Sequence, residues 1–173
     1  MAGKKKHPTE LASLYKRVLF WLQHFDLIPF YGTLLGIIRE GNFINGDDDV
    51  DMLAPKEQRD AILRRVSQAP ELEITNSTPD ILQLDYNGIG PFDIYFYETR
   101  GSDILLKWDG NLLYAASDIF PTKPMEFHGY VVSVPRDPVT LLTQTYGADW
   151  RIPQTKDEYS WWDIHQVRRV KND

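Results

Sequence analysis

The chain has 173 residues, a length that favours one domain spanning residues 1–173. Its formal net charge of −6 argues against a nucleic-acid binder that works through a basic surface. Hydrophobic residues make up 42% and aromatic residues 13%, which excludes a disordered chain. The sequence has no cysteine, so disulfides, zinc–thiolate sites and a cysteine nucleophile are excluded as well.

The first residues are basic, and no apolar segment of a secretory signal follows them. We therefore expect residues 1–8 to form a flexible basic tail. No stretch of the sequence is apolar over the roughly 18 residues that a transmembrane helix needs. These features predict a cytoplasmic protein without a transmembrane segment.

The first part of the chain is expected to form a helix, a strand and a second helix. Hydrophobic side chains recur at helical spacing over residues 10–25, and Thr9 is expected to cap this helix. An apolar run at residues 27–31 predicts a short buried strand. Residues 34–40 are then expected to form a short helix that ends near Gly41.

The middle of the chain is predicted to consist mainly of strands. Asn45-Gly46 is a strong turn signal, and a strand is expected over residues 47–54 after it. Pro55 is expected to open a charged helix. Further strands are expected at residues 72–75, 81–86, 91–97, 104–108, 112–115 and 130–134.

The C-terminal part is predicted to be helical again. Asp137 and Pro138 have the composition of a helix start, and Gly147 that of a helix end. A last helix is expected within residues 157–170. Because helices flank a run of strands, the sequence predicts an α+β domain.

The segment Asp47-Asp48-Asp49-Val50-Asp51 places four carboxylates in five positions. Because side chains alternate along a strand, Asp49 and Asp51 are expected on one face and Val50 in the core. Two unit charges about 4 Å apart repel by roughly 4 kcal/mol at an effective dielectric of 20, which a bound cation would offset. Oxygen ligands favour Mg²⁺ or Mn²⁺ over zinc. A solvated acidic turn is the alternative, and a calcium loop would need a different spacing.

A third carboxylate is predicted on a later strand. In Phe92-Asp93-Ile94 the two apolar residues are expected to face the core and Asp93 the opposite side. Asp93 is therefore a candidate third ligand or general base, although a lone acid on a strand is often only solvated. Asp85 is a rival that the sequence leaves open.

Gly32-Thr33 follows an apolar run and precedes a predicted helix, a pattern that can bind phosphate. Glycine lets the backbone approach the ligand closely, and N–H groups at a helix start point outward. Arg39 could add a charge-assisted contact to the same phosphate. Most Gly-Thr pairs are plain turns, so the informative feature is that this pair lies just ahead of the acidic segment.

Together these residues resemble the signature of the LicD/fukutin family. The resemblance begins with Gly32-Thr33-Leu34-Leu35-Gly36 and continues through Arg39, Gly41, Phe43-Ile44 and Asp47 to Asp51. Later elements that resemble the family are Phe92-Asp93-Ile94, Phe120-Pro121-x-Lys123, Val134-Pro135 and Tyr146-Gly147-x-Asp149-Trp150. Asn45-Gly46 departs from the family's usual Pro-Trp at that place. The resemblance implies a nucleotidyltransferase-like fold, with a mixed β-sheet flanked by helices.

The resemblance also implies a divalent-metal-dependent phosphotransferase that modifies glycans. Such an enzyme moves a phospho-alcohol, such as phosphocholine or ribitol phosphate, from a CDP-activated donor such as CDP-choline to a sugar hydroxyl. Its catalytic and metal-binding residues would be Asp49, Asp51 and Asp93, supported by Asp47 and Asp48. Its donor-binding residues would be Gly32, Thr33, Arg39 and Lys123.

Two other functions stay open at this point. The same three acids would serve a nucleotidyltransferase that transfers NMP, and a non-catalytic nucleotide-binding relative is the third reading. If the donor carries choline, an aromatic cage would be needed around its quaternary ammonium. Trp108, Tyr159, Trp161 and Trp162 could form one, although most aromatic residues simply pack.

Overall fold

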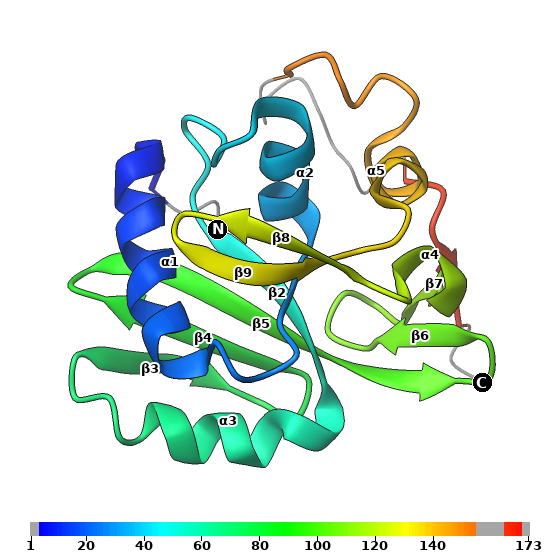
Figure 1. Cartoon of the computed structure of the whole chain (residues 1–173). Coiled ribbons are helices and arrows are strands. Elements are labelled where there is room, and N and C mark those ends of the chain that lie inside the picture. The colour runs from blue at the N-terminus through cyan, green and yellow to red at the C-terminus, as the bar shows by residue number, and fades with distance from the viewer. Residues whose placement is uncertain (1–3, 155–164, 171–173) are drawn as a thin grey trace.

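The computed structural model describes residues 4–154 and 165–170. It contains an eight-stranded mixed sheet with helices packed around it, and a separate two-stranded hairpin (Figure 1). The helices are α1 (Pro8–Leu22), α2 (Tyr31–Glu40), α3 (Arg59–Val66), α4 (Ala116–Ile119) and α5 (Pro138–Tyr146), with a 3-10 turn η1 (Lys56–Gln58). The strands are β1 (Ile28–Pro29), β2 (Val50–Pro55), β3 (Leu72–Ser77), β4 (Ile81–Tyr86), β5 (Ile89–Arg100), β6 (Asp103–Leu106), β7 (Leu112–Ala115), β8 (Lys123–Phe127), β9 (Tyr130–Val134) and β10 (Arg168–Arg169).

The long strand β5 is central to the sheet and pairs with three other strands. β2 pairs with β5 in parallel, whereas β4 and β6 pair with it antiparallel. β1 flanks β2, β3 flanks β4, and β7 and β10 continue the sheet beyond β6. The α+β prediction, with a mixed sheet flanked by helices, is therefore confirmed.

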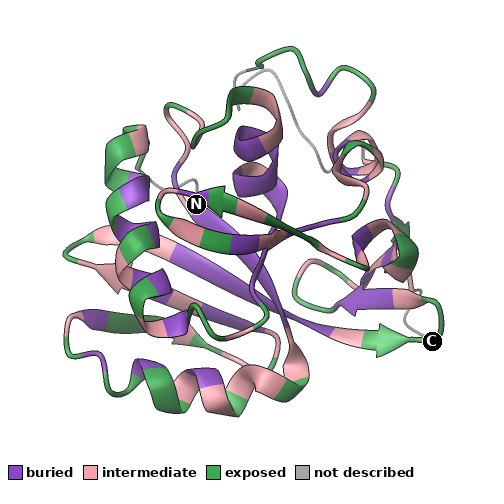
Figure 2. Cartoon of the chain, in the orientation of Figure 1, coloured by how far each residue is buried: buried purple, intermediate pink, exposed green. Residues whose placement is uncertain are grey.

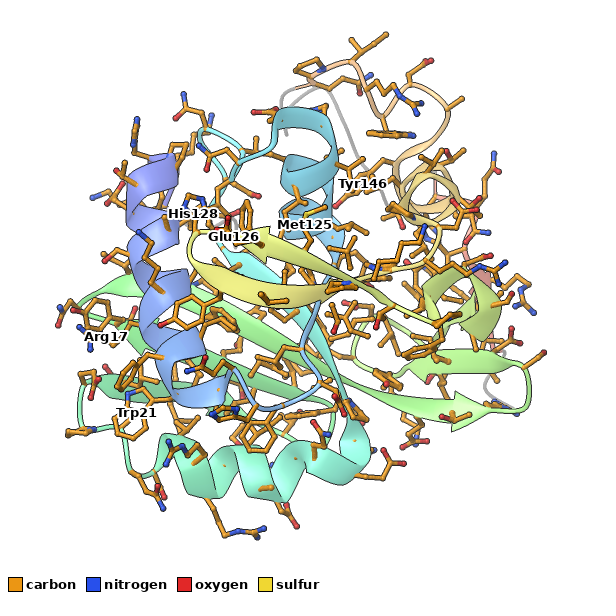
Figure 3. The ribbon with its side chains drawn as sticks, in the orientation of Figure 1. Arg17, Trp21, Met125, Glu126, His128 and Tyr146 are labelled. Atoms are coloured by element: carbon orange, nitrogen blue, oxygen red, sulfur yellow. The ribbon has the colours of Figure 1, made fainter. Side chains whose placement is uncertain are left out.

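α1 packs across β4 and β5 and also contacts α3. The N-cap lies two residues earlier than the predicted cap at Thr9, because His7 is the N-cap and Pro8 the first helical residue. The His7 N–H donates to the Glu10 carboxylate, which closes a capping box. On another side of α1, Arg17 and Trp21 (Figure 3) both reach the carboxylate of Glu71, just before β3.

α2 starts earlier than the sequence predicts. A strand is predicted at residues 27–31, but only β1 at residues 28–29 is extended, and Tyr31 already belongs to the helix. Tyr31 takes a left-handed backbone conformation with φ 40°, which turns the chain from strand to helix at once. The predicted end near Gly41 is confirmed, since Gly41 caps the helix with φ 65°. Gly32 and Thr33 consequently lie in the first turn of α2.

Several other boundaries differ from the expectations. β2 begins at Val50, so residues 47–49 lie in the preceding loop and not in the strand. The hairpin partner β8 is missed by the sequence pattern because Pro124 interrupts its alternation. The last predicted helix lies mostly outside the described residues, and its described end forms β10 with Arg168 and Arg169.

The β8–β9 hairpin passes beside α1 and contacts β1 through β9 (Figure 1). His128, labelled in Figure 3, lies at the tip of this hairpin and stacks on Phe43 with its ring edge-on to Tyr15. Figure 2 shows that burial is concentrated in the centre of the sheet and on the helix faces that cover it. Within the part of the chain that the structure describes, no helix combines the length and apolar character needed to cross a bilayer.

Residues 6–8 make defined contacts in the structure. Lys6 is buried, His7 caps α1 and Pro8 is helical. These contacts differ from those expected of the flexible tail predicted over residues 1–8. Lys6 also forms main-chain hydrogen bonds with the loop that precedes β2, through Asp47 and Gly46.

Candidate active site

Asp51 of β2 and Asp93 of β5 lie side by side in one row of the sheet. The two strands are parallel, and these residues are partners in the register. In-register residues on neighbouring strands project to the same face, with the strands about 4.8 Å apart. Gln83 of β4 continues the row beyond Asp93, and its Nε2 donates to Asp93 Oδ1 at 3.0 Å. The alternating neighbours are fully buried as predicted, namely Val50, Met52, Phe92 and Ile94.

Tyr95 joins the two acids from the same face of β5. Its hydroxyl lies 3.2 Å from Asp51 Oδ1 and 3.4 Å from Asp93 Oδ2, and it can donate to either carboxylate. Sequence reasoning did not identify Tyr95 or Gln83. The two-residue period of β5 places Tyr95 on the face of Asp93 and could have revealed it, whereas no local pattern points to Gln83.

The first turn of α2 contacts the same acid. The Thr33 hydroxyl accepts a hydrogen bond from the Asp51 N–H at 2.8 Å, and the Gly32 N–H donates to Asp51 Oδ2 at 3.2 Å. A Cβ atom on Gly32 would lie 2.7 Å from Asp47 Oδ2, closer than Cβ contacts in real proteins, so the Asp47 side chain would have to move. Glycine at position 32 therefore leaves room for the carboxylates beside the start of α2.

The acids form two overlapping groups. Carboxylate oxygens of Asp49, Asp51 and Asp93 lie within 4.8 Å of one another, and so do those of Asp47, Asp48 and Asp49. Asp49 belongs to both groups although it lies in the loop and not, as predicted, in the strand. Purely oxygen-based sets of this size fit Mg²⁺ or Mn²⁺, and two adjacent sets could hold two ions that share Asp49.

The electrostatics of the site also fit a cation. Burial raises the pKa of Asp51 well above its ordinary value, and the negative charges of Asp49, Asp93 and Asp47 raise it further. Burial likewise raises the pKa of Asp93 to about 6, against the opposing hydrogen bonds from Gln83 and Tyr95. Ionised acids are therefore unfavourable here until a positive charge joins them.

Asp109 is a further acid that the sequence did not indicate. Tyr31 reaches it from the start of α2, and the Tyr31 hydroxyl donates to Asp109 Oδ2 at 2.6 Å. Burial raises the pKa of Asp109 to about 6, and its charge in turn raises the pKa of Asp93. The Tyr31 ring also packs edge-on against Tyr95 at 5.3 Å between centroids. Asp109 lies in a turn between β6 and β7, where no motif distinguishes it.

The rival acid and the predicted phosphate-binding cations lie elsewhere. Asp85 accepts from the Gly88 N–H in the β4–β5 turn, and it belongs to neither acid group of the described residues. Arg39 donates to the Glu40 carboxylate and to the Trp150 carbonyl, which ties α2 to the segment after α5. These contacts give Arg39 a structural role.

Lys123 and Trp108 lie outside the acid row. Lys123 is exposed at the start of β8. Hydrogen bonds from Thr140 lower the pKa of Asp137 at the start of α5, and the charge of Lys123 lowers it slightly further. Trp108 is an exposed side chain in the β6–β7 turn. The remaining candidates for a cage, Tyr159, Trp161 and Trp162, lie outside the described residues.

Comparison with known proteins gives a family and a fold. The family described as LicD/FKTN/FKRP, nucleotidyltransferase domain, matches residues 24–137. No curated protein gives a significant sequence match. Among solved structures, ANT(2″)-Ia in complex with adenylyl-2″-tobramycin aligns with a TM-score of 0.57 and 14% identity, over 88% of this chain and 83% of that chain. The lincomycin-bound lincosamide adenylyltransferase LnuA aligns with a TM-score of 0.47 and 12% identity, over 76% and 81%.

The alignment with ANT(2″)-Ia shows that the two proteins share a fold. The predicted nucleotidyltransferase-like architecture is therefore confirmed. The matched family segment contains Gly32, Thr33 and the acids from Asp47 to Asp93. The segment that carries the family match is thus also the segment that builds the acid row.

Proposed function

Because the chain belongs to the LicD/FKTN/FKRP family and has a nucleotidyltransferase fold, it is a transferase, and we propose that it transfers a phospho-alcohol from a CDP-activated donor to a sugar hydroxyl of a glycan. Phosphocholine and ribitol phosphate are the groups that we propose first. The observation that carries the proposal is the parallel register of Asp51 with Asp93, which together with Asp49 gives three converging carboxylates.

In this reaction the acceptor oxygen forms a bond to the phosphorus that bears the alcohol. The bond from that phosphorus to the bridging oxygen breaks, and CMP leaves with the bridging oxygen. The proton of the acceptor hydroxyl passes to a base, a role that we assign to Asp93. Tyr95 and Gln83 hold the Asp93 carboxylate in place through their hydrogen bonds.

We assign the metal-binding role to Asp49 and Asp51, with Asp93 as a further ligand and Asp47 and Asp48 as support. Bound Mg²⁺ or Mn²⁺ would neutralise charge on the donor's phosphate oxygens, which is the main requirement of phosphoryl transfer. The Gly32 and Thr33 contacts orient Asp51 for this task. Repulsion among the ionised acids supports the assignment, because a divalent ion would relieve it.

The donor phosphates are assigned to the first turn of α2 and to nearby cations. The backbone at Gly32 is the proposed contact, since it lies in the first turn of a helix and carries no side chain between it and the acids. Arg39 at the end of the same helix and Lys123 are the proposed cationic contacts. Arg39 would exchange its exposed partner Glu40 for phosphate while its Trp150 contact holds the side chain in place.

Nucleotidyl transfer is the second candidate. It is favoured by the shared fold with ANT(2″)-Ia, which was solved with the adenylylated product adenylyl-2″-tobramycin. The same acids would serve both reactions, so the arrangement of the site is equally suitable for either. The two differ in what the acceptor gains, which is a phospho-alcohol in one case and a nucleoside monophosphate in the other.

A donor screen separates these functions. The protein is incubated with Mn²⁺ and CDP-choline, CDP-ribitol, CDP-glycerol or CTP, with simple glycosides as acceptors and water as the default acceptor. Mass spectrometry should detect CMP and an acceptor that carries the phospho-alcohol, and Asp51→Asn should show neither. Release of pyrophosphate from CTP would instead establish nucleotidyl transfer. Binding of every donor without turnover would identify a non-catalytic nucleotide-binding protein.

A further inference from the structure

Lys6 is a buried cation beside the acidic loop. Only 8% of the residue is exposed, and its ammonium donates to three main-chain carbonyls. These are Asp48 O at 2.5 Å, Gly90 O at 2.6 Å and Lys4 O at 3.2 Å. An ammonium has three donors and no acceptor, so the three bonds use its full capacity. A buried charge is tolerated only with such complete pairing, which fixes the position of the side chain.

The main chain around Lys6 is paired with the same loop. The Lys6 N–H donates to Asp47 O at 2.9 Å, and the Gly46 N–H donates to Lys6 O at 3.0 Å. Figure 1 accordingly draws the N-terminal segment close to the chain that leads into β2. Backbone and side chain of one residue thus hold three consecutive loop residues, Gly46, Asp47 and Asp48.

Two of the carbonyls that accept from the ammonium belong to the loop that precedes β2 and to the start of β5. Asp48 directly precedes Asp49, the acid shared by both carboxylate groups. Gly90 lies at the start of β5, three residues before Asp93. Lys6 therefore links the loop that carries Asp49 to the strand that carries Asp93, from outside the hydrogen bonds of the β2–β5 pair.

We propose that Lys6 is a positioning residue that sets the distance between Asp49 and Asp93 and so shapes the divalent-metal site. The role rests on the proposed metal-dependent function. It is exerted through the backbone, because the ammonium donates to main-chain carbonyls. Positioning contacts outside the ligands of a metal site typically change its affinity or activity by about 10–100-fold.

The charge of Lys6 alone would have the opposite effect on metal binding. A positive charge near a cation site repels the incoming ion, so removing it should tighten binding. Removing a positioning contact should weaken binding, because the loop acids lose their fixed geometry. The direction of the change in affinity therefore separates the two roles.

The test measures Mn²⁺ affinity of the full chain by calorimetry, without any donor. Lys6→Met keeps the length and apolar stem of the side chain but removes the ammonium. We expect Mn²⁺ binding to weaken by about 10–100-fold. Amide hydrogen exchange at residues 46–49 should quicken in the metal-free protein, because the loop loses its anchor. Unchanged or tighter Mn²⁺ binding by Lys6→Met would overturn the proposal.

Lys5→Met is the matched control, because it removes the same charge from an exposed neighbouring side chain. Its Mn²⁺ affinity should be unchanged or slightly higher, and an equal loss in both variants would refute a specific role for Lys6. Ile62→Val in α3 controls for a general loss of stability and should bind Mn²⁺ normally. If Lys6→Met does not fold, Lys6→Gln, which retains an amide donor, is judged by the same criteria.

The unmodified protein distinguishes this proposal from the proposed function. If it binds no Mn²⁺, the metal-dependent function fails, and the role of Lys6 fails with it. If it binds Mn²⁺ and Asp51→Asn does not, while Lys6→Met binds normally, only the role of Lys6 is refuted. Weaker binding by Lys6→Met alone supports both.

Discussion

Two acidic residues of β5, Glu98 and Asp93, have pKa values that are shifted in opposite directions. Near the C-terminal end of β5, Glu98 accepts from Lys56 Nζ at 2.6 Å and from Lys107 Nζ at 2.8 Å, and these bonds lower its pKa. Five residues earlier, Asp93 has the neutral partners Gln83 and Tyr95, and burial raises its pKa to about 6. Glu98 is therefore paired with two lysine side chains, whereas Asp93 lies near further negative charges.

This difference separates a structural acid cluster from a candidate binding site. Glu98, Lys56, Lys107 and Asp80 form a partly exposed network in which opposite charges alternate. Asp51 and Asp93 are buried beside further acids, an arrangement that costs free energy in the absence of a ligand. Acid content alone would not separate these regions, whereas the sign of the pKa shift does.

The largest effect is expected from Asp51→Asn. Mn²⁺ binding should be lost and turnover should fall to the rate without enzyme, because Asp51 lies in the central row of the site. The metal-free variant should nevertheless be more stable than the unmodified protein at pH 7, since a buried and repelled charge is removed. Denaturant unfolding in EDTA checks the stability. A stability loss together with normal Mn²⁺ binding would remove the contrast between the acid row of Asp51 and Asp93 and the ion-pair network around Glu98.

A smaller but still severe effect is expected from Asp93→Asn. The amide keeps an oxygen ligand but cannot accept the acceptor's proton, so turnover should fall by about 10²–10⁴-fold with part of the donor affinity retained. Asp85→Asn is the control on the neighbouring strand and should be mild, since Asp85 serves the β4–β5 turn. Initial rates and calorimetry of donor binding decide the result. A severe defect in Asp85→Asn together with an active Asp93→Asn would show that the assignment of Asp93 as the third acid is wrong.

The pH dependence of the metal-free protein offers a further test. The pKa of Asp93 is raised from 3.8 to about 6 in the folded state, so the unfolded chain ionises first and the fold loses stability as pH rises from about 4 to about 6. Lowering the pH from 7 to 5 should therefore stabilise the unmodified protein relative to Asp93→Asn, by on the order of 1 kcal/mol. Mn²⁺ affinity should fall over the same range, because protons compete for the carboxylates. Parallel pH profiles for both proteins would contradict this expectation.

The smallest effect is expected from Glu98→Gln at the other end of the strand. Its ion pairs with Lys56 and Lys107 are partly exposed, and such pairs contribute less than about 1 kcal/mol each. The variant should lose a little stability, and the loss should shrink in high salt. Turnover and Mn²⁺ binding should stay unchanged. A gain in metal-free stability like that of Asp51→Asn would remove the contrast between the two ends.

The local part of this site could be predicted from the sequence, since alternation identifies Val50 and Met52 as core residues and Asp51 as their opposite. Alternation on β5 likewise identifies Phe92 and Ile94 as core residues and places Asp93 on the opposite face. Asp49 lies in a loop, so the strand rule does not apply to it, although its carboxylate reaches the predicted group. Local patterns indicate that acids share a face, but they do not show which strands are neighbours.

Long-range contacts account for what the sequence did not indicate. The sequence places Lys6 in a run of lysines, which predicts a solvated basic tail. Its hydrogen bond to Gly90, 84 residues away in the chain, leaves no trace in the local composition. Asp109 and Gln83 occupy ordinary positions in a turn and a strand, and only the sheet brings them to the site. Prediction was least informative for residues that act through a distant partner.

The parallel pairing of β2 with β5 has a consequence for the order in which the protein is made. Parallel neighbours need a crossover, and here α3, β3 and β4 lie between the two strands. Asp93 follows Asp51 by 42 residues, so at about 5–20 residues per second the ribosome releases it roughly 2–8 seconds later. During that interval β2 can pair with β1 but lacks the strand that carries Asp93. The rate at which the site matures therefore depends on a crossover that contributes none of its acids.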